Sequence, residues 1–176
     1  MIRSYDSDTG QRQVPIISSE WGYSDTWSRL NEESQAVMLT REFLTNVADG
    51  NDPNEPEDHF GLVRNAYRSG QTPAYDPKPA YFATQTLTKV LSGYRFQERL
   101  KVGSADDYVL VFVKDSERRF VTWTTSPVAR HVMIENLAAQ YSVVTATGES
   151  AAGIGPTSGA LNVELTSAPK YLIPIH

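Results

Sequence analysis

A glutamate and two aromatic residues directly follow one short apolar segment of this 176-residue chain. Residues 14–19 are mostly apolar and include β-branched side chains, which predicts a short buried strand. Glu20, Trp21 and Tyr23 come next. In parallel α/β architectures the loops after the strands meet at one face, where active sites lie. A carboxylate beside aromatic rings at such a place suits the handling of a sugar ring, which packs its C–H faces on aromatic planes.

Glycoside hydrolysis normally needs two carboxylates, and this segment offers one. Asn54-Glu55-Pro56 matches the acid/base signature of many sugar-cleaving barrels, in which the Glu ends a strand and precedes the nucleophile. Residues 49–53 have turn composition, so we expect no strand before Glu55, and Glu55 follows Glu20 in the chain. We interpret the tripeptide as a chance match. For Glu20 itself, a loop carboxylate that caps Ser24 or a nearby helix is the structural alternative.

The three histidines and the absence of cysteine give no indication of a metal or cofactor site. His59, His131 and His176 lie far apart without ligand spacing, and there is no cysteine, which excludes disulfides, thiolate catalysis and cysteine-bound zinc. We therefore expect neither metal nor cofactor. His59, beside an aromatic residue, is a candidate to line a polar cleft; the alternative is a solvated loop histidine.

The composition is that of an ordinary globular protein, with 40% hydrophobic and 21% charged residues. The formal net charge is −5 and the basic residues are scattered singly, which argues against nucleic-acid and membrane-surface partners. No stretch is long and apolar enough to span a bilayer, and the first residues lack the apolar core of a secretion signal. The sequence does not indicate the cellular compartment.

The chain changes its periodicity near residue 97. Before it, apolar spacings of three and four predict helices over about 32–48 and 78–92, separated by a long polar loop over 49–76. After it, short strands are spaced about ten residues apart, which indicates an antiparallel sandwich or meander. These strands are expected over 108–113, 120–125, 132–134, 141–145, 161–165 and 171–173, with Trp123 in the core and a loop over 148–159.

The stretch from Pro15 to Ser24 resembles the seventh-strand nucleophile motif of retaining clan A glycoside hydrolases, the (β/α)8 barrels of the family 5 and family 39 type. Residues 35–47 resemble the seventh helix, 58–63 the segment after the eighth strand, and 77–91 the last helix. The remainder resembles the small β-sandwich appended to many such enzymes. The resemblance implies an α+β chain: residues 1–97 as a (β/α)8 barrel remnant and 98–176 as a small antiparallel β-sandwich.

The same resemblance implies roles for the four candidate residues. Glu20 is the expected nucleophile, and Trp21, Tyr23 and His59 the expected substrate-binding residues. The strands one to six of the family pattern, with the acid/base Glu, have no counterpart here, and an apolar eighth strand ending in Trp is not evident. We therefore expect that this chain alone does not hydrolyse glycosides.

Three interpretations remain open at this stage. The first is the C-terminal portion of a retaining glycoside hydrolase that acts on an oligo- or polysaccharide. The second is a non-catalytic carbohydrate-binding or interaction module centred on the β-sandwich. The third is a subunit that complements a separate polypeptide carrying the missing barrel strands. The sugar, the linkage and the oligomeric state are not readable from these residues.

Overall fold

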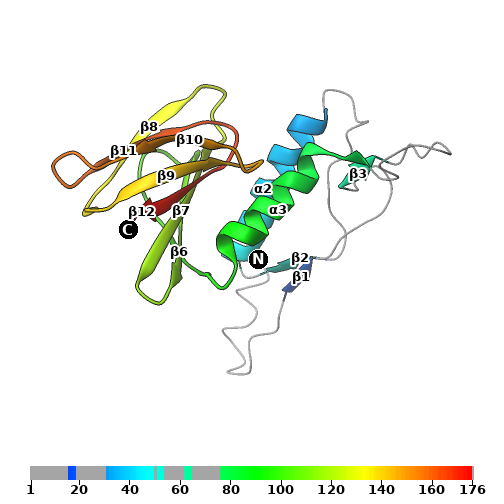
Figure 1. The fold of residues 1–176 in the computed structure, drawn as a ribbon, viewed down its shortest axis with the longest axis horizontal. Helices are drawn as coiled ribbons and strands as arrows, with labels where there is room; N and C mark the ends of the chain where they lie inside the picture. The colour runs from blue at the N-terminus through cyan, green and yellow to red at the C-terminus, as the bar shows by residue number, and fades with distance from the viewer. Residues whose placement is uncertain (1–15, 19–30, 50, 54–61, 65–75, 176) are drawn as a thin grey trace.

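The computed structural model describes residues 16–18, 31–49, 51–53, 62–64 and 76–175. This part of the chain is mostly β-sheet with two helices. Figure 1 shows three layers: a pair of helices, a six-stranded sheet, and a two-stranded sheet on the far side of it.

The first part of the described chain contains short strands and both helices. The elements are β1 (Ile16–Ser18), α2 (Glu32–Asp49), β2 (Asn51–Pro53), β3 (Val63–Arg64), β4 (Asp76–Pro77) and α3 (Pro79–Leu91). β1 and β2 pair in parallel, whereas β3 and β4 pair antiparallel. The unit β1–α2–β2 is therefore a parallel strand pair joined by a helix.

The second part, which we call the sheet region, contains only strands. They are β5 (Arg95–Arg99), β6 (Asp107–Lys114), β7 (Glu117–Thr124), β8 (Arg130–Ile134), β9 (Gln140–Thr145), β10 (Ser150–Ile154), β11 (Leu161–Leu165) and β12 (Lys170–Ile175). The six-stranded sheet has the order β10-β9-β12-β7-β6-β5, and β11 pairs with β8 in the second sheet. All of these pairings are antiparallel.

The middle of the six-stranded sheet is buried on both faces, which explains the near-continuous apolar run of β6. Successive side chains of a strand point to opposite faces. Val109 and Val111 accordingly join the core between the two sheets, while Leu110 and Phe112 join a second core under the helices. A strand covered on one face alone would alternate apolar and polar residues, as the buried and exposed residues of β11 do.

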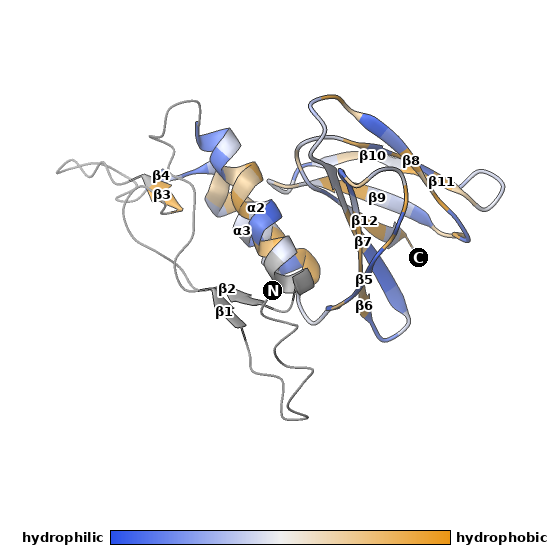
Figure 2. Cartoon of the chain, turned by 180° about the vertical axis from the view of Figure 1, so that it is seen from behind, coloured by the Kyte–Doolittle hydropathy of each residue, from blue (hydrophilic) through white to orange (hydrophobic). Residues whose placement is uncertain are grey.

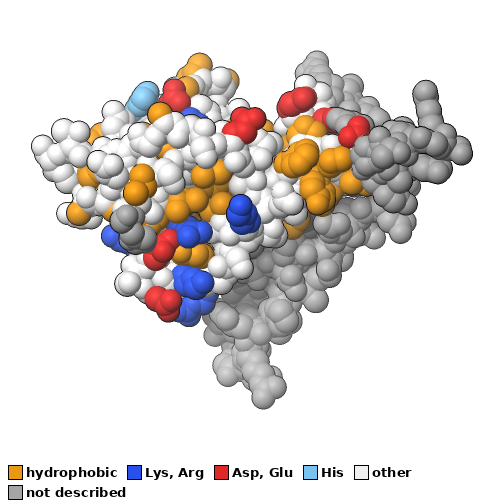
Figure 3. All heavy atoms as spheres, in the orientation of Figure 1, with side chains coloured by type: hydrophobic (Ala, Val, Ile, Leu, Met, Phe, Trp, Pro, Cys, Tyr) orange, Lys and Arg blue, Asp and Glu red, His pale blue; other side chains and the backbone are white. Residues whose placement is uncertain are grey.

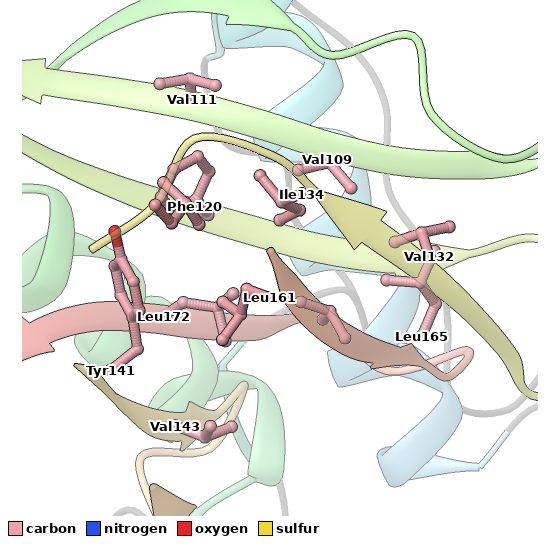
Figure 4. Close-up of a cluster of buried hydrophobic side chains, with 12 residues drawn as sticks. Val109, Val111, Phe120, Val132, Ile134, Tyr141, Val143, Leu161, Leu165 and Leu172 are labelled. Atoms are coloured by element: carbon pink, nitrogen blue, oxygen red, sulfur yellow. The ribbon is translucent and has the colours of Figure 1, made fainter. Parts of the chain in front are cut away.

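The core between the sheets is drawn in Figure 4. Phe120 from β7 and Tyr141 from β9 meet edge to face, with ring centroids 5.7 Å apart. Leu161 and Leu165 of β11 close this core from the two-stranded sheet, and both are fully buried. The short β8–β11 ribbon is thus held by side-chain burial against the larger sheet.

The second core joins the helices to the sheet. Leu44 of α2 and Val90 of α3 pack on Trp123 and Tyr171, both of which are about 1% exposed or less. Each helix carries hydrophobic and hydrophilic residues (Figure 2), as an amphipathic helix on a sheet does. Trp123 was expected in the core of the strands; it is buried, but on the face that the helices cover.

Four strands were not expected from the sequence, and one of them is β4, at the end of the loop expected over 49–76. β2 lies in the segment assigned to a long loop, so the expectation that no strand precedes Glu55 is wrong. β10 lies within the loop expected over 148–159, and β5 spans the expected boundary at residue 97. All four are short and carry at most one large apolar side chain each, and each pairs through its backbone with a neighbouring strand.

Candidate functional site

The candidate site begins at the parallel pair of β1 and β2. Their register aligns Ile16 with Asn51, Ile17 with Asp52 and Ser18 with Pro53, so both strands end at the same edge. The carboxyl ends of parallel strands are where such architectures place their active sites.

The predicted site residues all lie outside the described residues. Glu20 follows β1 by two positions, and Trp21 and Tyr23 come shortly after it; His59 follows β2 by six positions. Their roles therefore stay predictions. The described structure includes β1, the strand that precedes Glu20 in the sequence, and β2, which pairs with it.

Helix α2 connects the two strands and begins at a polar cap. Asn31 Oδ1 accepts a hydrogen bond from the Ser34 N–H at 2.8 Å, and Glu32 and Glu33 lie in the first turn. Both features stabilise a helix N-terminus, because they satisfy a free N–H and oppose the helix dipole. The helix start is therefore well specified by local sequence.

Arg41 ties α2 to the sheet region. Its Nε donates to the Ser167 carbonyl at 2.8 Å, and its Nη2 donates to the Thr124 carbonyl at 2.8 Å and also to Ser167. A guanidinium can serve two carbonyls at once because its donors lie in a fixed plane. Nothing in the sequence around Arg41 indicated this role, since its partners are backbone atoms far along the chain.

Helix α3 packs on α2 through small residues. Ala36 of α2 lies in one cluster with Ala80 and Ala83 of α3, and all three are buried. Pro79 occupies the first turn of α3, where its missing N–H costs nothing. On its other side α3 is held by Arg119 of β7, which donates to the Val90 carbonyl.

Two carboxyl groups of the described chain have shifted pKa values and buried oxygens. Burial raises the pKa of Glu42 on α2, and Glu42 Oε2 has no hydrogen-bond partner among the described residues. For Asp107, burial opposes ionisation, but hydrogen bonds from Ser104, Thr124 and Arg130 outweigh it and lower the pKa.

The surroundings of Asp107 indicate a structural role. It fixes the turn before β6 and joins β6, β7 and β8, and its side chain has no exposed surface. Among the described residues no three His, Cys, Asp or Glu side chains gather in a way that would hold a metal ion. No described helix is both long enough and apolar enough to cross a membrane.

The fold has clear counterparts among solved structures. A family 39 glycoside hydrolase from Bacteroides cellulosilyticus WH2 matches 95% of this chain with a TM-score of 0.71 and 21% identity. A GH30 endoxylanase from Clostridium papyrosolvens C71 matches 92% of it with a TM-score of 0.66 and 14% identity. The chain shares its fold with part of these glycoside hydrolases. It spans 35% of the first structure and 42% of the second.

A third solved structure, the family 30 subfamily 8 xylanase Xyn30A from Clostridium acetobutylicum, matches 92% of this chain with a TM-score of 0.62 and 11% identity. It too is matched over 42% of its own length. No family model and no curated protein sequence matches the chain. The likeness is thus one of fold, and it extends across the helices and the sheet region together.

Proposed function

We propose that this chain is the C-terminal portion of a retaining glycoside hydrolase. Residues 1–97 carry the last strand-helix units of a (β/α)8 barrel, and residues 98–176 form the appended antiparallel β-sandwich. The observation that carries the proposal is the fold likeness to family 39 and family 30 enzymes over 92–95% of this chain. The parallel β1–α2–β2 unit supports it, because such units build the barrel.

Glu20 is the nucleophile in this proposal. It would attack the anomeric carbon and form a glycosyl-enzyme intermediate, which water then hydrolyses. Trp21 and Tyr23 would shape the adjacent sugar subsite, and His59 would orient the substrate. The support for Glu20 is its sequence position two residues after β1, because a parallel barrel has its active site at the carboxyl ends of its strands.

The isolated chain lacks part of the machinery in this proposal. A retaining mechanism needs a second carboxyl group about 5 Å from the nucleophile. In the clan A pattern that group comes from a strand that has no counterpart here. The second carboxylate, and the strands that complete the barrel, would come from further polypeptide that supplies the rest of the fold.

The β-sandwich has a supporting role in this proposal. Arg41 and Arg119 join the helices to the strands through backbone carbonyls, and Trp123 packs beneath the helices. These contacts hold α2 and α3 against the six-stranded sheet. The sandwich thereby covers the flank of the barrel and stiffens its last helices.

The competing function, a carbohydrate-binding module centred on the sandwich, has less support among the described residues. Such a module should present aromatic rings to solvent. The large hydrophobic side chains exposed in the sheet region are Val128, Met133 and Ile175, none of them aromatic. The ring of Tyr108 stacks on Trp123 at 4.6 Å, and the Arg99 guanidinium lies 3.6 Å from the centre of the Tyr108 ring.

A trapping experiment tests the proposal. The chain is mixed with the polypeptide encoded immediately upstream of it, produced as a separate chain, and treated with 2-deoxy-2-fluoro glycosides of xylose and glucose. We expect aryl-glycoside turnover by the mixture alone and a covalent label on Glu20 in the peptide map. Glu20→Gln should abolish both signals and Glu55→Gln should leave them. A label on another residue, or turnover that survives Glu20→Gln, would contradict the assignment.

A further inference from the structure

Two large aromatic side chains are exposed on the first turn of α3. Tyr81 is 38% exposed and Phe82 is 42% exposed, and their rings meet edge to face with centroids 5.6 Å apart. The rest of the outward face of α3 is polar, with Gln85 and Lys89 one and two turns further on. Figure 3 shows hydrophobic side chains gathered at this end of the helix pair. The exposed aromatic surface of α3 is thus confined to its first turn.

Packing among the described residues does not account for these two aromatic side chains. The inner face of α3 is already complete, with Ala80 and Ala83 against α2 and Val90 against the sheet. An amphipathic helix normally presents polar residues on its outer face. Exposed aromatic rings that lie together mark contact sites, since each ring buries a large apolar area at a small entropic cost.

The neighbouring strands identify the kind of partner. β1 and β2 pair only with each other among the described strands, although parallel strands occur in larger sheets with both faces covered. The helix starts lie together: Ala36 in the second turn of α2 packs on Ala80 in the first turn of α3. The helices therefore run in the same direction, as successive helices of repeated strand-helix units do.

We propose that Tyr81 and Phe82 bind an amphipathic helix of the polypeptide that supplies the further strand-helix units. This inference rests on the proposed function, since the partner is the remainder of the barrel. It is supported by the size of the structural neighbours, of which this chain spans 35–42%. The partner helix presents an apolar patch that crosses the first turn of α3 and meets polar residues beyond Phe82.

The test uses the full chain and the polypeptide encoded immediately upstream, produced separately. The double variant Tyr81→Gln/Phe82→Gln removes the aromatic patch, and Gln85→Ala/Lys89→Ala is the matched control on the same helix face. Both pairs are exposed, so the fold should persist, which the melting temperature and circular dichroism check. Binding is measured by isothermal titration calorimetry, with sedimentation of each chain alone.

We expect the aromatic double variant to weaken binding by about tenfold or more, and the control by less than about twofold. Equal binding by both variants, or no binding by the unchanged chain, would overturn the inference. Self-association of this chain that is lost in the aromatic variant would also overturn it, because a second copy would then be the occupant. Binding without glycoside turnover would support this surface and count against the proposed function.

Discussion

Arg41 of α2 donates two hydrogen bonds to the backbone carbonyl of Ser167, a residue 126 positions further along the chain. A third bond goes from Arg41 to the Thr124 carbonyl at 2.8 Å. Ser167 and Thr124 belong to the sheet region, and α2 belongs to the strand-helix unit that precedes it. This one side chain thus links α2 to two separate backbone positions of the sheet region.

The first prediction concerns this link. Arg41→Ala should lower the free energy of unfolding by about 1–2 kcal/mol, because charge-assisted hydrogen bonds to two carbonyls are lost. Arg41→Lys should restore only part of it, since an ammonium group cannot match the planar fork of a guanidinium. Urea denaturation measures the change, with Lys89→Ala on the exposed face of α3 as the control. An unchanged midpoint in Arg41→Ala would show that these bonds add nothing.

The second prediction concerns Asp107 and acid. Its folded-state pKa lies below the ordinary 3.8, because hydrogen bonds from Ser104, Thr124 and Arg130 outweigh burial. The stability that Asp107 contributes is therefore present above about pH 4 and is lost as the pH falls through the lowered pKa. Asp107→Asn should lower the free energy of unfolding by about 3 kcal/mol at neutral pH, because it leaves the Arg130 charge without its buried partner. The free energy of unfolding of this variant should also depend less on pH in the acid range.

Asp106→Asn is the matched control for this experiment, since Asp106 is the exposed neighbour in the sequence. Glu164, whose pKa is lowered by its hydrogen bond from Lys170, keeps part of the acid dependence in both variants. The measurement is the urea midpoint as a function of pH. Parallel curves for Asp107→Asn and the unchanged chain would refute a titrating role for Asp107.

The strands of the sheet region were largely predictable, for a physical reason. β11 alternates buried Leu161, Val163 and Leu165 with exposed residues, and its bounds equal the expected 161–165. β6 is an apolar run covered on both faces. Its short length and its β-branched residues already indicate a buried strand rather than a helix. In these strands the side chains themselves supply the burial that selects the conformation.

The elements that the sequence did not reveal depend on partners elsewhere in the chain. β10, with Ser150, Ala151 and Ala152 exposed, has no apolar alternation and exists by pairing with β9. β2 has turn composition and exists by pairing with β1. For the candidate site, local sequence marked Glu20 through its aromatic company, but a partner carboxylate from a distant strand leaves no trace in local spacing.

The third prediction concerns Glu42, whose folded-state pKa is raised above the ordinary 4.5 by burial. The folded protein therefore binds the proton more tightly than the unfolded chain, so this group costs stability once the pH rises through the raised pKa. Glu42→Gln should raise the free energy of unfolding at pH 7 by less than about 1 kcal/mol. The gain should vanish below about pH 4, where both forms are neutral. Glu33→Gln, on the exposed first turn of α2, should show no such gain.

The fourth prediction separates the two cores that share the six-stranded sheet. Trp123 and Phe120 are about equally buried on the same strand, but Trp123 faces the helices and Phe120 faces the β8–β11 ribbon. Each change to Ala should destabilise the chain by about 3–5 kcal/mol, because it removes a buried ring and leaves a cavity. Hydrogen exchange should then differ between them: Trp123→Ala should release the amides of α2 and α3 first, and Phe120→Ala those of β8 and β11. The same exchange pattern in both variants would mean that helices, sheet and ribbon unfold as one unit, and that Trp123 does not specifically hold the helices on the sheet.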